Sequence, residues 1–327
     1  DLKKVGRPAV MMSFVPASFE ILGYILCAPA ILGISRVDAA VMGAVLGAVS
    51  PAVVVPRMVK FIETKYGTGK AIPQMILAGA SCDDIFVIVL FSTFLGMAQG
   101  GSVRAADFLN IPVSIVLGIL LGAVFGYGLS CFFERAYEKK HYIRNSMKVV
   151  VVLGMSFLLM SVEAWLEDVV SVSGLLAVVS MACMIKIKSA PIVSKRLSEK
   201  FGKLWVAAEV MLFVLVGAAV DIRYTMGAGA AAVLMIAIAL GFRAVGVCLC
   251  LAGTKLNRRE RLFGIIAYLP KATVQAAIGS VPLAAGLPCG QLVLSVAVLS
   301  ILITAPLGAV GMDLTYRKFL EKEKEVS

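Results

Sequence analysis

The sequence is poor in charge and has almost no histidine. Only 16% of its 327 residues are charged, 60% are apolar, and the mean hydropathy is +0.95. Soluble globular proteins carry about 25% charged residues, so this composition excludes an ordinary soluble enzyme, a disordered chain and a nucleic-acid-binding domain. With His141 as the single histidine, neither an H-E-x-x-H metalloprotease site nor a histidine-rich metal site can form. The seven cysteines include no C-x-x-C pair and lie in or beside apolar stretches, as small core residues do.

Long apolar stretches dominate the chain. A bilayer-spanning helix needs about 20 largely apolar residues, and ten stretches come close to that length, joined by short polar loops. The sequence therefore predicts an all-α, multi-pass membrane protein with about ten spans in this chain, surrounded by the lipid bilayer. The predicted spans are 8–34, 38–59, 71–98, 108–131, 147–165, 170–186, 204–221, 227–252, 262–283 and 289–312.

The positive charges are sorted by the side of the membrane on which they would lie. Of the 31 Lys and Arg, all but five fall in the even-numbered connections or at the two ends. Arg36, Arg104 and Arg223 lie on the other side, and Arg243 and Lys271 lie inside apolar segments. Cytoplasmic loops are enriched in Lys and Arg, so both ends of the chain are predicted to be cytoplasmic. The formal charge of +11 then requires no nucleic acid or other acidic partner.

Six ionisable side chains lie within the predicted spans. A charge at mid-bilayer costs about 2.5–3.5 kcal/mol, so each one needs a partner or a function. Asp83 and Asp84 sit near the middle of the third span, about 100° apart around a helix. A buried carboxyl can hold either a proton or a small cation, and hard monovalent cations favour oxygen ligands. The six side chains are Glu20, Asp83, Asp84, Glu209, Arg243 and Lys271.

Prolines interrupt the second and the ninth predicted spans. Pro51 and Pro56 lie in the second span, and Pro270 lies in the ninth, directly before Lys271. Proline removes a helical hydrogen bond, and backbone groups freed at membrane depth are tolerated only where they line a cavity or are buried in protein. We therefore expect two broken helices, with Lys271 offsetting the partial negative charge of their C-terminal ends. Together with the acid pair, the hydroxyls beside the breaks complete the candidate cation ligands Asp83, Asp84, Ser50 and Thr273.

The order of these features repeats between the two ends of the chain. Spans one to three carry Glu20, a broken helix and the acid pair, and spans eight to ten carry Arg243, a broken helix and a mostly apolar helix. Because an offset of seven spans is odd, the two triplets would cross the bilayer in opposite directions, as in inverted-repeat transporters. Glu20 and Arg243 hold equivalent positions, and a buried ion pair between them would neutralise both. The predicted divisions are a first core unit (1–98), connecting and scaffold helices (99–226), a second core unit (227–312) and a cytoplasmic tail (313–327).

Three stretches of the sequence resemble a known family. Residues 79–85 (GASCDDI) resemble the double-aspartate helix of the monovalent cation:proton antiporter superfamily. Residues 46–56 (LGAVSPAVVVP) and 269–279 (LPKATVQAAIG) resemble the first and second broken helices of its NHA-type sodium/proton antiporters. Glu20 and Arg243 fall where that branch carries its buried acid and arginine.

This resemblance implies a homodimeric antiporter that works by an elevator-like, alternating-access motion. The inverted repeats would form the core with its two crossed, broken helices, and the remaining helices would form the dimerisation scaffold. Asp83 and Asp84 would bind the cation, with Asp84 the foremost candidate. Family members usually have twelve or more spans, so N-terminal spans are expected to be missing from this chain. Arg243 stands where more distant antiporters have a lysine linked to electrogenic exchange, which implies electroneutral 1:1 exchange.

The sequence thus predicts a secondary transporter of the cell membrane that exchanges Na⁺ or Li⁺ for H⁺. It would be no enzyme and would need no cofactor, since the ions are transported, and its partners would be a monovalent cation and a second copy of itself. K⁺/H⁺ antiport and sodium-coupled symport of an organic anion are alternatives on the same fold. An intramembrane aspartyl protease is disfavoured because it needs its two aspartates on separate helices, and a passive channel because a tight mid-membrane carboxylate slows permeation.

Overall fold

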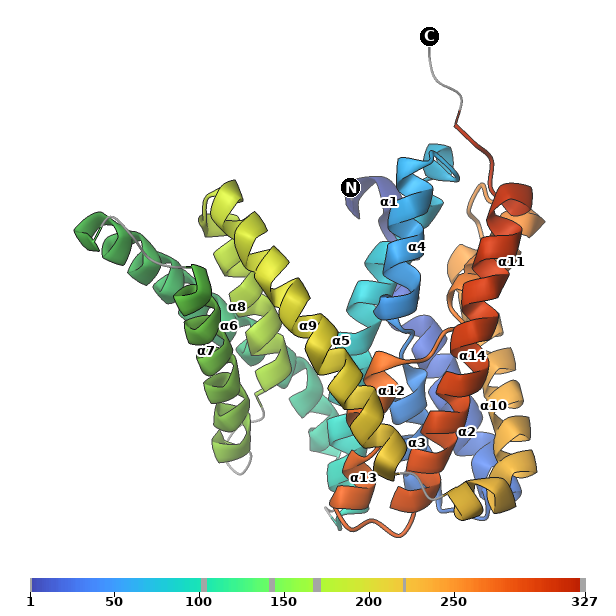
Figure 1. The fold of residues 1–327 in the computed structure, drawn as a ribbon. Coiled ribbons are helices and arrows are strands. Elements are labelled where there is room, and N and C mark those ends of the chain that lie inside the picture. Colours follow the sequence, from blue (N-terminus) through green and yellow to red (C-terminus); the bar gives the residue numbers. More distant parts are fainter. Residues whose placement is uncertain (1, 101–104, 141–144, 167–171, 220–221, 324–327) are drawn as a thin grey trace. The chain divides into compact units, whose positions relative to one another are not determined.

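The computed structural model describes residues 2–100, 105–140, 145–166, 172–219 and 222–323. Within these ranges the protein is almost wholly helical (Figure 1), apart from a short 3₁₀ turn, η1 (Thr68–Lys70), and one antiparallel bridge between Tyr66 and Lys322. Arg104 and His141 lie outside the described residues. The described helices are α1 (Leu2–Met12), α2 (Val15–Leu32), α3 (Arg36–Gly47), α4 (Pro51–Glu63), α5 (Ile72–Ala98), α6 (Ala105–Lys140), α7 (Asn145–Leu166), α8 (Gly174–Lys188), α9 (Pro191–Ala219), α10 (Ile222–Leu251), α11 (Arg258–Ala267), α12 (Thr273–Ile278), α13 (Val281–Ala284) and α14 (Gly290–Phe319).

The chain forms two compact units. The first unit contains Asp1–Gly101 and Leu212–Ser327, so the two ends of the chain fold together, and the second contains Ser102–Met211. In the first unit, α2, α3, α5, α10 and α14 share a core of small and aliphatic side chains. The finer division of this unit into two repeats, residues 1–98 and 227–312, stays a prediction.

Seven helical stretches among the described residues are long and apolar enough to cross a membrane. Of the other predicted spans, 170–186 coincides with α8, which has 15 residues, and 204–221 falls at the end of α9. The predicted span 262–283 is divided among the short helices α11, α12 and α13. The multi-pass, all-helical class is therefore confirmed, whereas the count of ten spans stays a prediction. The seven stretches are Gly6–Leu32, Arg36–Glu63, Ile72–Ala98, Val116–Arg135, Ser146–Glu163, Gly229–Leu251 and Gly290–Phe319.

The first broken helix consists of α3 and α4. Ser35 caps α3, because its Oγ accepts a hydrogen bond of 3.1 Å from the backbone N–H of Asp38. The helix ends at Gly47, and the backbone is extended at Ala48 and Ser50. Pro51 then opens α4, in the first turn, where a missing N–H leaves no hydrogen bond unmade.

Pro56 does not lie at the break, so this part of the prediction is wrong. Helix α4 runs unbroken from Pro51 to Glu63, and Pro56 lies inside it with an exposed side chain. A proline in this place removes one helical hydrogen bond, and membrane helices compensate for that loss through neighbouring groups and small backbone adjustments.

The second broken helix consists of α11 and the short helices after it. A capping box starts α11: the Asn257 side chain accepts from the Glu260 N–H, and the Glu260 carboxylate accepts from the Asn257 N–H, both at 2.8 Å. The helix ends at Ala267, and residues 268–272 form the break. Pro270 cannot continue a helix, and α12 begins at Thr273.

Two helix boundaries differ from the sequence prediction. The first predicted span is two helices, since α1 ends at Met12 and α2 begins at Val15 after a turn at Ser13 and Phe14. At the other end of the chain, α14 runs past residue 313 to Phe319. The first part of the expected cytoplasmic tail therefore extends the last helix.

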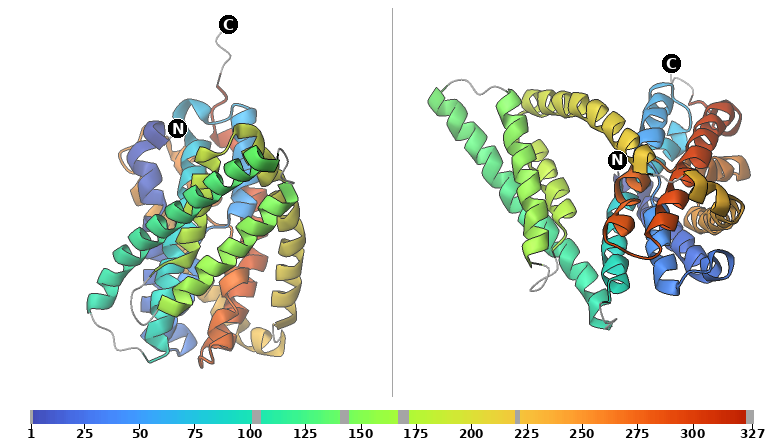
Figure 2. Two further views of the ribbon diagram at one scale, coloured as in Figure 1. Left: turned by 90° about the vertical axis from the view of Figure 1, so that its left-hand side faces the viewer. Right: turned by 60° about the horizontal axis from the view of Figure 1, so that its bottom comes forward.

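Close packing of α6 on α8 builds the second unit, and α7 packs on α8 as well (Figure 2). Gly118, Gly122 and Gly126 recur every four residues along α6. A Cβ atom added at Gly118 would lie 2.5 Å from the carbonyl oxygen of Ser173, and one at Gly126 would lie 2.6 Å from that of Met181. Small residues at this spacing let membrane helices approach closely.

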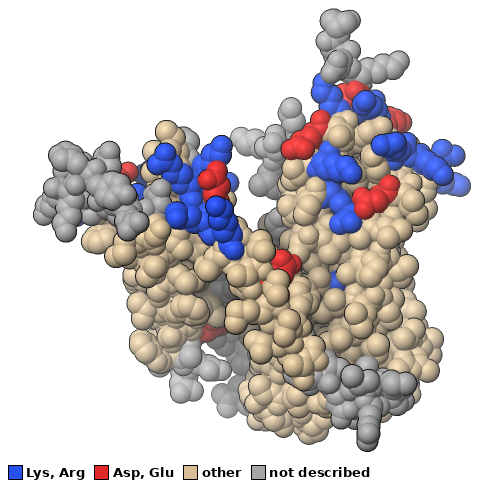
Figure 3. All heavy atoms as spheres, viewed as in Figure 1, with Lys and Arg blue, Asp and Glu red and all other residues tan. Residues whose placement is uncertain are grey.

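Charged side chains gather at one end of the first unit. Figure 3 shows its Lys, Arg, Asp and Glu side chains mainly over the ends of α4 and α14 and the start of α11, with only isolated charged atoms on the tan surface below them. The second unit likewise carries its visible Lys and Arg at one end. A charged end and a long uncharged flank are what a protein embedded in a bilayer requires.

Candidate functional site

The two helix breaks meet inside the first unit and are hydrogen-bonded to each other. The backbone N–H of Ser50 donates to the carbonyl oxygen of Pro270 at 2.8 Å. The side chain of Gln275 adds two bonds, as its Nε2 donates to the Ala48 carbonyl at 2.9 Å and its Oε1 accepts from the Ala272 N–H at 2.8 Å. The Ser50 N–H and the Ala48 carbonyl of the first break are thus paired with groups of the second break, whereas the Ala272 N–H is paired within its own break.

Arg243 of α10 lies at this crossing and is 1% exposed. Its Nη1 lies 2.5 Å from Glu20 Oε2 and donates to the Gly47 carbonyl, and its Nε donates to the Tyr268 carbonyl at 2.7 Å. Its Nη2 lies 3.2 Å from Asp83 Oδ2. Gly47 is the last residue of α3, and Tyr268 directly follows the end of α11. The guanidinium therefore holds both helix C-termini, where a cation is favoured, as well as two acids.

Lys271 also reaches Glu20. Its Nζ lies 2.6 Å from Glu20 Oε2, the same oxygen that Arg243 contacts, and both cations are 1% exposed. The sequence predicted the Glu20–Arg243 pair, and the structure brings these two residues together. It predicted that Lys271 offsets the helix ends, whereas the described contact of its ammonium is with the carboxylate of Glu20.

The two aspartates have different surroundings. Asp83 is fully buried, and its Oδ2 accepts from the Val49 N–H at 2.8 Å in addition to its ion pair with Arg243. Asp84 is partly buried and forms no ion pair within the described part of the chain. Asp83 Oδ1, Asp84 Oδ1 and the Oγ of Ser50 are buried and have no hydrogen-bond partner among the described residues. Unpartnered buried oxygens next to a carboxyl pair are suited to a desolvated cation or a proton.

Apart from Pro56, the remaining predicted site residues belong to the two breaks or the helix starts beside them. Thr273 is the first residue of α12 and is 8% exposed. Pro51 opens α4, and Pro270 supplies the carbonyl that Ser50 contacts. Within the described ranges, no group of three or more His, Cys, Asp or Glu is arranged to hold a metal ion.

Several residues of the crossing were missed by the sequence analysis. Gln275 and Thr304 are buried polar side chains in apolar helices, and both bond to the second break. Tyr268 is buried beneath the Arg243 guanidinium and donates from its hydroxyl to the Met12 carbonyl at 3.3 Å. A glutamine within a predicted span was a signal that could have been used, because an amide at that depth needs partners. A single threonine or tyrosine carries no such signal.

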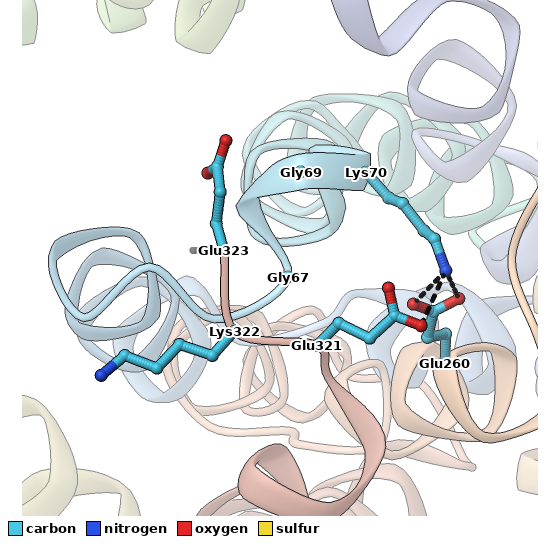
Figure 4. Close-up of a pocket in the computed structure, with 7 residues that line it drawn as sticks. All are labelled: Gly67, Gly69, Lys70, Glu260, Glu321, Lys322 and Glu323. Atoms are coloured by element: carbon cyan, nitrogen blue, oxygen red, sulfur yellow. Dashed lines mark hydrogen bonds and ion pairs between the residues drawn. The ribbon is translucent and has the colours of Figure 1, made fainter. Parts of the chain in front are cut away.

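A second polar cluster lies at the charged end of the first unit (Figure 4). The ammonium of Lys70 lies 2.8 Å from Glu260 Oε1 and 3.4 Å from Glu321 Oε1. The chain after α14 is held here, since the Gly67 N–H donates to the Glu321 carbonyl at 2.8 Å. The hydrogen bond to the Glu260 carboxylate raises the pKa of Lys70 above its usual value. This cluster fastens η1, α11 and the end of α14 to one another.

Comparison with known proteins shows one consistent likeness. Residues 1–313 match the family described as "Sodium/hydrogen exchanger, transmembrane". The chain is 35% identical to the human protein named sodium/hydrogen exchanger 9B2 over 98% of its own length, and 31% identical to human sodium/hydrogen exchanger 9B1 over 88%. It covers 60% and 56% of those two proteins, so it spans less than two thirds of their length.

The fold also matches a solved structure. The sodium proton antiporter MjNhaP1 from Methanocaldococcus jannaschii superposes with a TM-score of 0.82 over 97% of this chain and 80% of that one, at 20% sequence identity. At this identity the likeness shows the fold, and it extends over nearly all of the chain.

Proposed function

Because the chain belongs to the sodium/hydrogen exchanger family, we propose that it exchanges Na⁺ or Li⁺ for H⁺ across a membrane. The observation that carries this proposal is the carboxyl pair Asp83–Asp84 beside two crossed helix breaks, with unpartnered buried oxygens on both aspartates and on Ser50. Such a site gives a small cation oxygen ligands and gives a proton a carboxyl to neutralise.

The two aspartates would have different parts in this exchange. Asp83 is held by Arg243 and by the Val49 N–H, so its carboxylate is already partly compensated. Asp84 has no described ion pair, so its charge must be neutralised by a bound proton or a bound cation. Since each neutralises the same group, the two ions compete for it. An empty, charged site is costly to move through the bilayer, and this couples the two fluxes.

The two units of the protein would have different parts in transport. The site would face each side of the membrane in turn, with the crossed breaks as the core of two inverted repeats and the helices of the second unit as the scaffold of a homodimer. Arg243 stays protonated and carries no proton across, which favours electroneutral exchange. We place the protein in the cell membrane with both ends of this chain cytoplasmic, in line with the sorting of its Lys and Arg.

The test is ion exchange by purified protein in liposomes that contain a trapped pH dye. Addition of Na⁺ or Li⁺ outside should produce a saturable pH change that Asp84→Asn abolishes while the protein still folds. Glu209→Gln is the matched control, because it also converts a carboxyl to an amide in an apolar part of a helix, α9, and Glu209 takes part in none of the contacts described at the crossing. Full exchange by Asp84→Asn would overturn the proposal, and exchange driven by K⁺ but not by Na⁺ or Li⁺ would replace its substrate.

A further inference from the structure

The peptide group between Pro270 and Lys271 is held from both sides. Its carbonyl accepts from the Ser50 N–H at 2.8 Å, and its N–H donates to the Oγ1 of Thr304 in α14 at 2.9 Å. The Thr304 hydroxyl in turn donates to the Ser300 carbonyl at 2.7 Å. Thr304 and Lys271 are each 1% exposed, and Ser50 is fully buried. One threonine thus fixes the orientation of the peptide on which the first break rests.

The first broken helix contains a bond that matches the one between Lys271 and Thr304 at the second break. The Val49 N–H of the first break donates to Asp83 in α5, and the Lys271 N–H of the second break donates to Thr304 in α14. The bonded residues are 34 and 33 positions apart in the chain. At each break, a backbone N–H donates a hydrogen bond to a side-chain oxygen on the next long helix of the chain. The acceptor for the first break is a carboxylate, and the acceptor for the second break is a neutral hydroxyl.

From this arrangement we propose that Thr304 is a positioning residue for the cation site, acting through the Pro270–Lys271 peptide. This inference rests on the proposed function. Without its acceptor, the buried Lys271 N–H would be left unpaired, and such a group moves to find another partner. Rotation of that peptide turns the Pro270 carbonyl away from Ser50, and it shifts the Lys271 ammonium relative to Glu20.

A displacement of the Pro270–Lys271 peptide would move the cation ligands, because Ser50 and its neighbour Val49 connect them to it. Ser50 carries one of the unpartnered buried oxygens, and its neighbour Val49 holds Asp83 in place. A shift in the first break therefore changes the spacing between the Ser50 hydroxyl and the aspartates. The affinity for the cation would fall, because the altered groups are the cation's ligands. The maximal transport rate of the loaded protein would change little.

The neighbouring Ser300 provides a matched control. Its Oγ is buried on the same helix but has no hydrogen-bond partner among the described residues, and only its main-chain carbonyl takes part in the chain of bonds. Ser300→Ala removes a buried hydroxyl one turn from Thr304 and leaves every bond described above intact. Thr304→Ser keeps the hydroxyl that accepts from Lys271, and Thr304→Val replaces it by a methyl group of similar size.

The experiment measures the Na⁺ and Li⁺ dependence of exchange in liposomes for these variants beside the wild type. We expect Thr304→Val to raise the KM for Na⁺ about tenfold with a maximal rate within about twofold of wild type. Thr304→Ser should restore the KM to within about threefold, and Ser300→Ala should leave it unchanged. If Thr304→Val does not accumulate, Thr304→Ala and Thr304→Ser give the same comparison, since they differ by the hydroxyl alone.

A wild-type KM for Thr304→Val, or an equal rise in KM for Thr304→Val and Ser300→Ala, would overturn the positioning role. An equal loss for Thr304→Ser and Thr304→Val would also overturn it, because the first variant retains the acceptor. Failure of the proposed function has a different signature: the wild type itself would show no Na⁺- or Li⁺-dependent exchange, or Asp84→Asn would exchange normally.

Discussion

Asp83 is joined to Arg243 by a buried ion pair of 3.2 Å, while Asp84, the next residue in the chain, has no ion pair within the described ranges. Because successive residues on a helix point about 100° apart, one carboxyl of the pair can be fixed while the other stays available. At such a site the charge of one carboxylate is balanced by an ion pair and the charge of the other is not. The second carboxylate can therefore bind one positive charge at a time without any rearrangement of the ion pair.

Arg243 should be central to the stability of the first unit. Arg243→Ala removes the partner of Asp83 and one of the two cations at Glu20, and it leaves the Gly47 and Tyr268 carbonyls unpaired. Removal of one partner from a buried pair costs about 3–5 kcal/mol. Thermal unfolding in detergent should therefore show a clear fall in melting temperature.

A double variant measures the interaction between Glu20 and Arg243 separately from the other contacts of each residue. Addition of Glu20→Gln to Arg243→Ala should cost less than the two single changes summed, since the acid left behind by the first change is removed by the second. Additive losses, or an unchanged melting temperature for Arg243→Ala, would count against a buried pair.

The two aspartates should respond differently to the same substitution. Asp83→Asn weakens bonds to Arg243 and to the Val49 N–H, and loss of a hydrogen bond to a charged group costs about 1.5–3 kcal/mol. Asp84→Asn breaks no described hydrogen bond, so the variant should unfold within a few degrees of the wild type. The reverse order of melting temperatures would contradict the roles given to the two residues.

Gln275 should couple the two breaks. Gln275→Leu leaves the Ala48 carbonyl and the Ala272 N–H unpaired in the protein interior, which we expect to destabilise the first unit by about 2 kcal/mol. Gln275→Glu keeps the acceptor for Ala272, but it replaces the donor to Ala48 by a carboxyl oxygen that is either protonated or adds a buried charge. Chemical denaturation of the three proteins in detergent measures the difference, and equal stability of wild type and Gln275→Leu would refute the coupling.

These contacts show which features of the site could be predicted from the sequence. Two opposite charges in apolar spans, Glu20 and Arg243, had to find each other, because neither could remain alone in a bilayer. Pro51 and Pro270 marked the breaks for a similarly general reason. Pro56 misled because proline is also tolerated inside a membrane helix.

Other parts of the site could not be predicted in this way. The bond between Lys271 and Thr304 joins two helices whose register appears only after folding, and serine and threonine are common in membrane helices with no special role. The salt bridge from Lys271 to Glu20 depends on the path of residues 268–272, which have no periodic pattern. The turn at Ser13 and Phe14 lies in an apolar stretch that gives no sign of it.

The cluster around Lys70 gives a pH-dependent prediction. The pKa of this lysine is raised by its hydrogen bond to Glu260, so the contact stabilises the protein below the usual lysine pKa and is lost as the pH rises through the raised value. Lys70→Met should lower the stability at pH 7 by about 1 kcal/mol, and its difference from wild type should vanish only in strongly alkaline solution.

Lys322 serves as the control for that change. Its side chain points away from Glu260 in Figure 4, and it contacts the Tyr66 ring with its ammonium 5.9 Å from the ring centre. Lys322→Met should therefore have a smaller effect than Lys70→Met at pH 7. A difference between wild type and Lys70→Met that disappears near neutral pH would contradict the ion pair.

The most direct test of competition at the aspartates is proton release on cation binding. Purified protein in weakly buffered detergent solution is mixed with NaCl or LiCl, and a dissolved pH dye reports the protons set free. Competition of the two ions for Asp84 predicts saturable acidification with the wild type, none with Asp84→Asn, and wild-type behaviour with Glu209→Gln. Cation binding detected by calorimetry without proton release from the wild type, over the pH range of exchange, would contradict it.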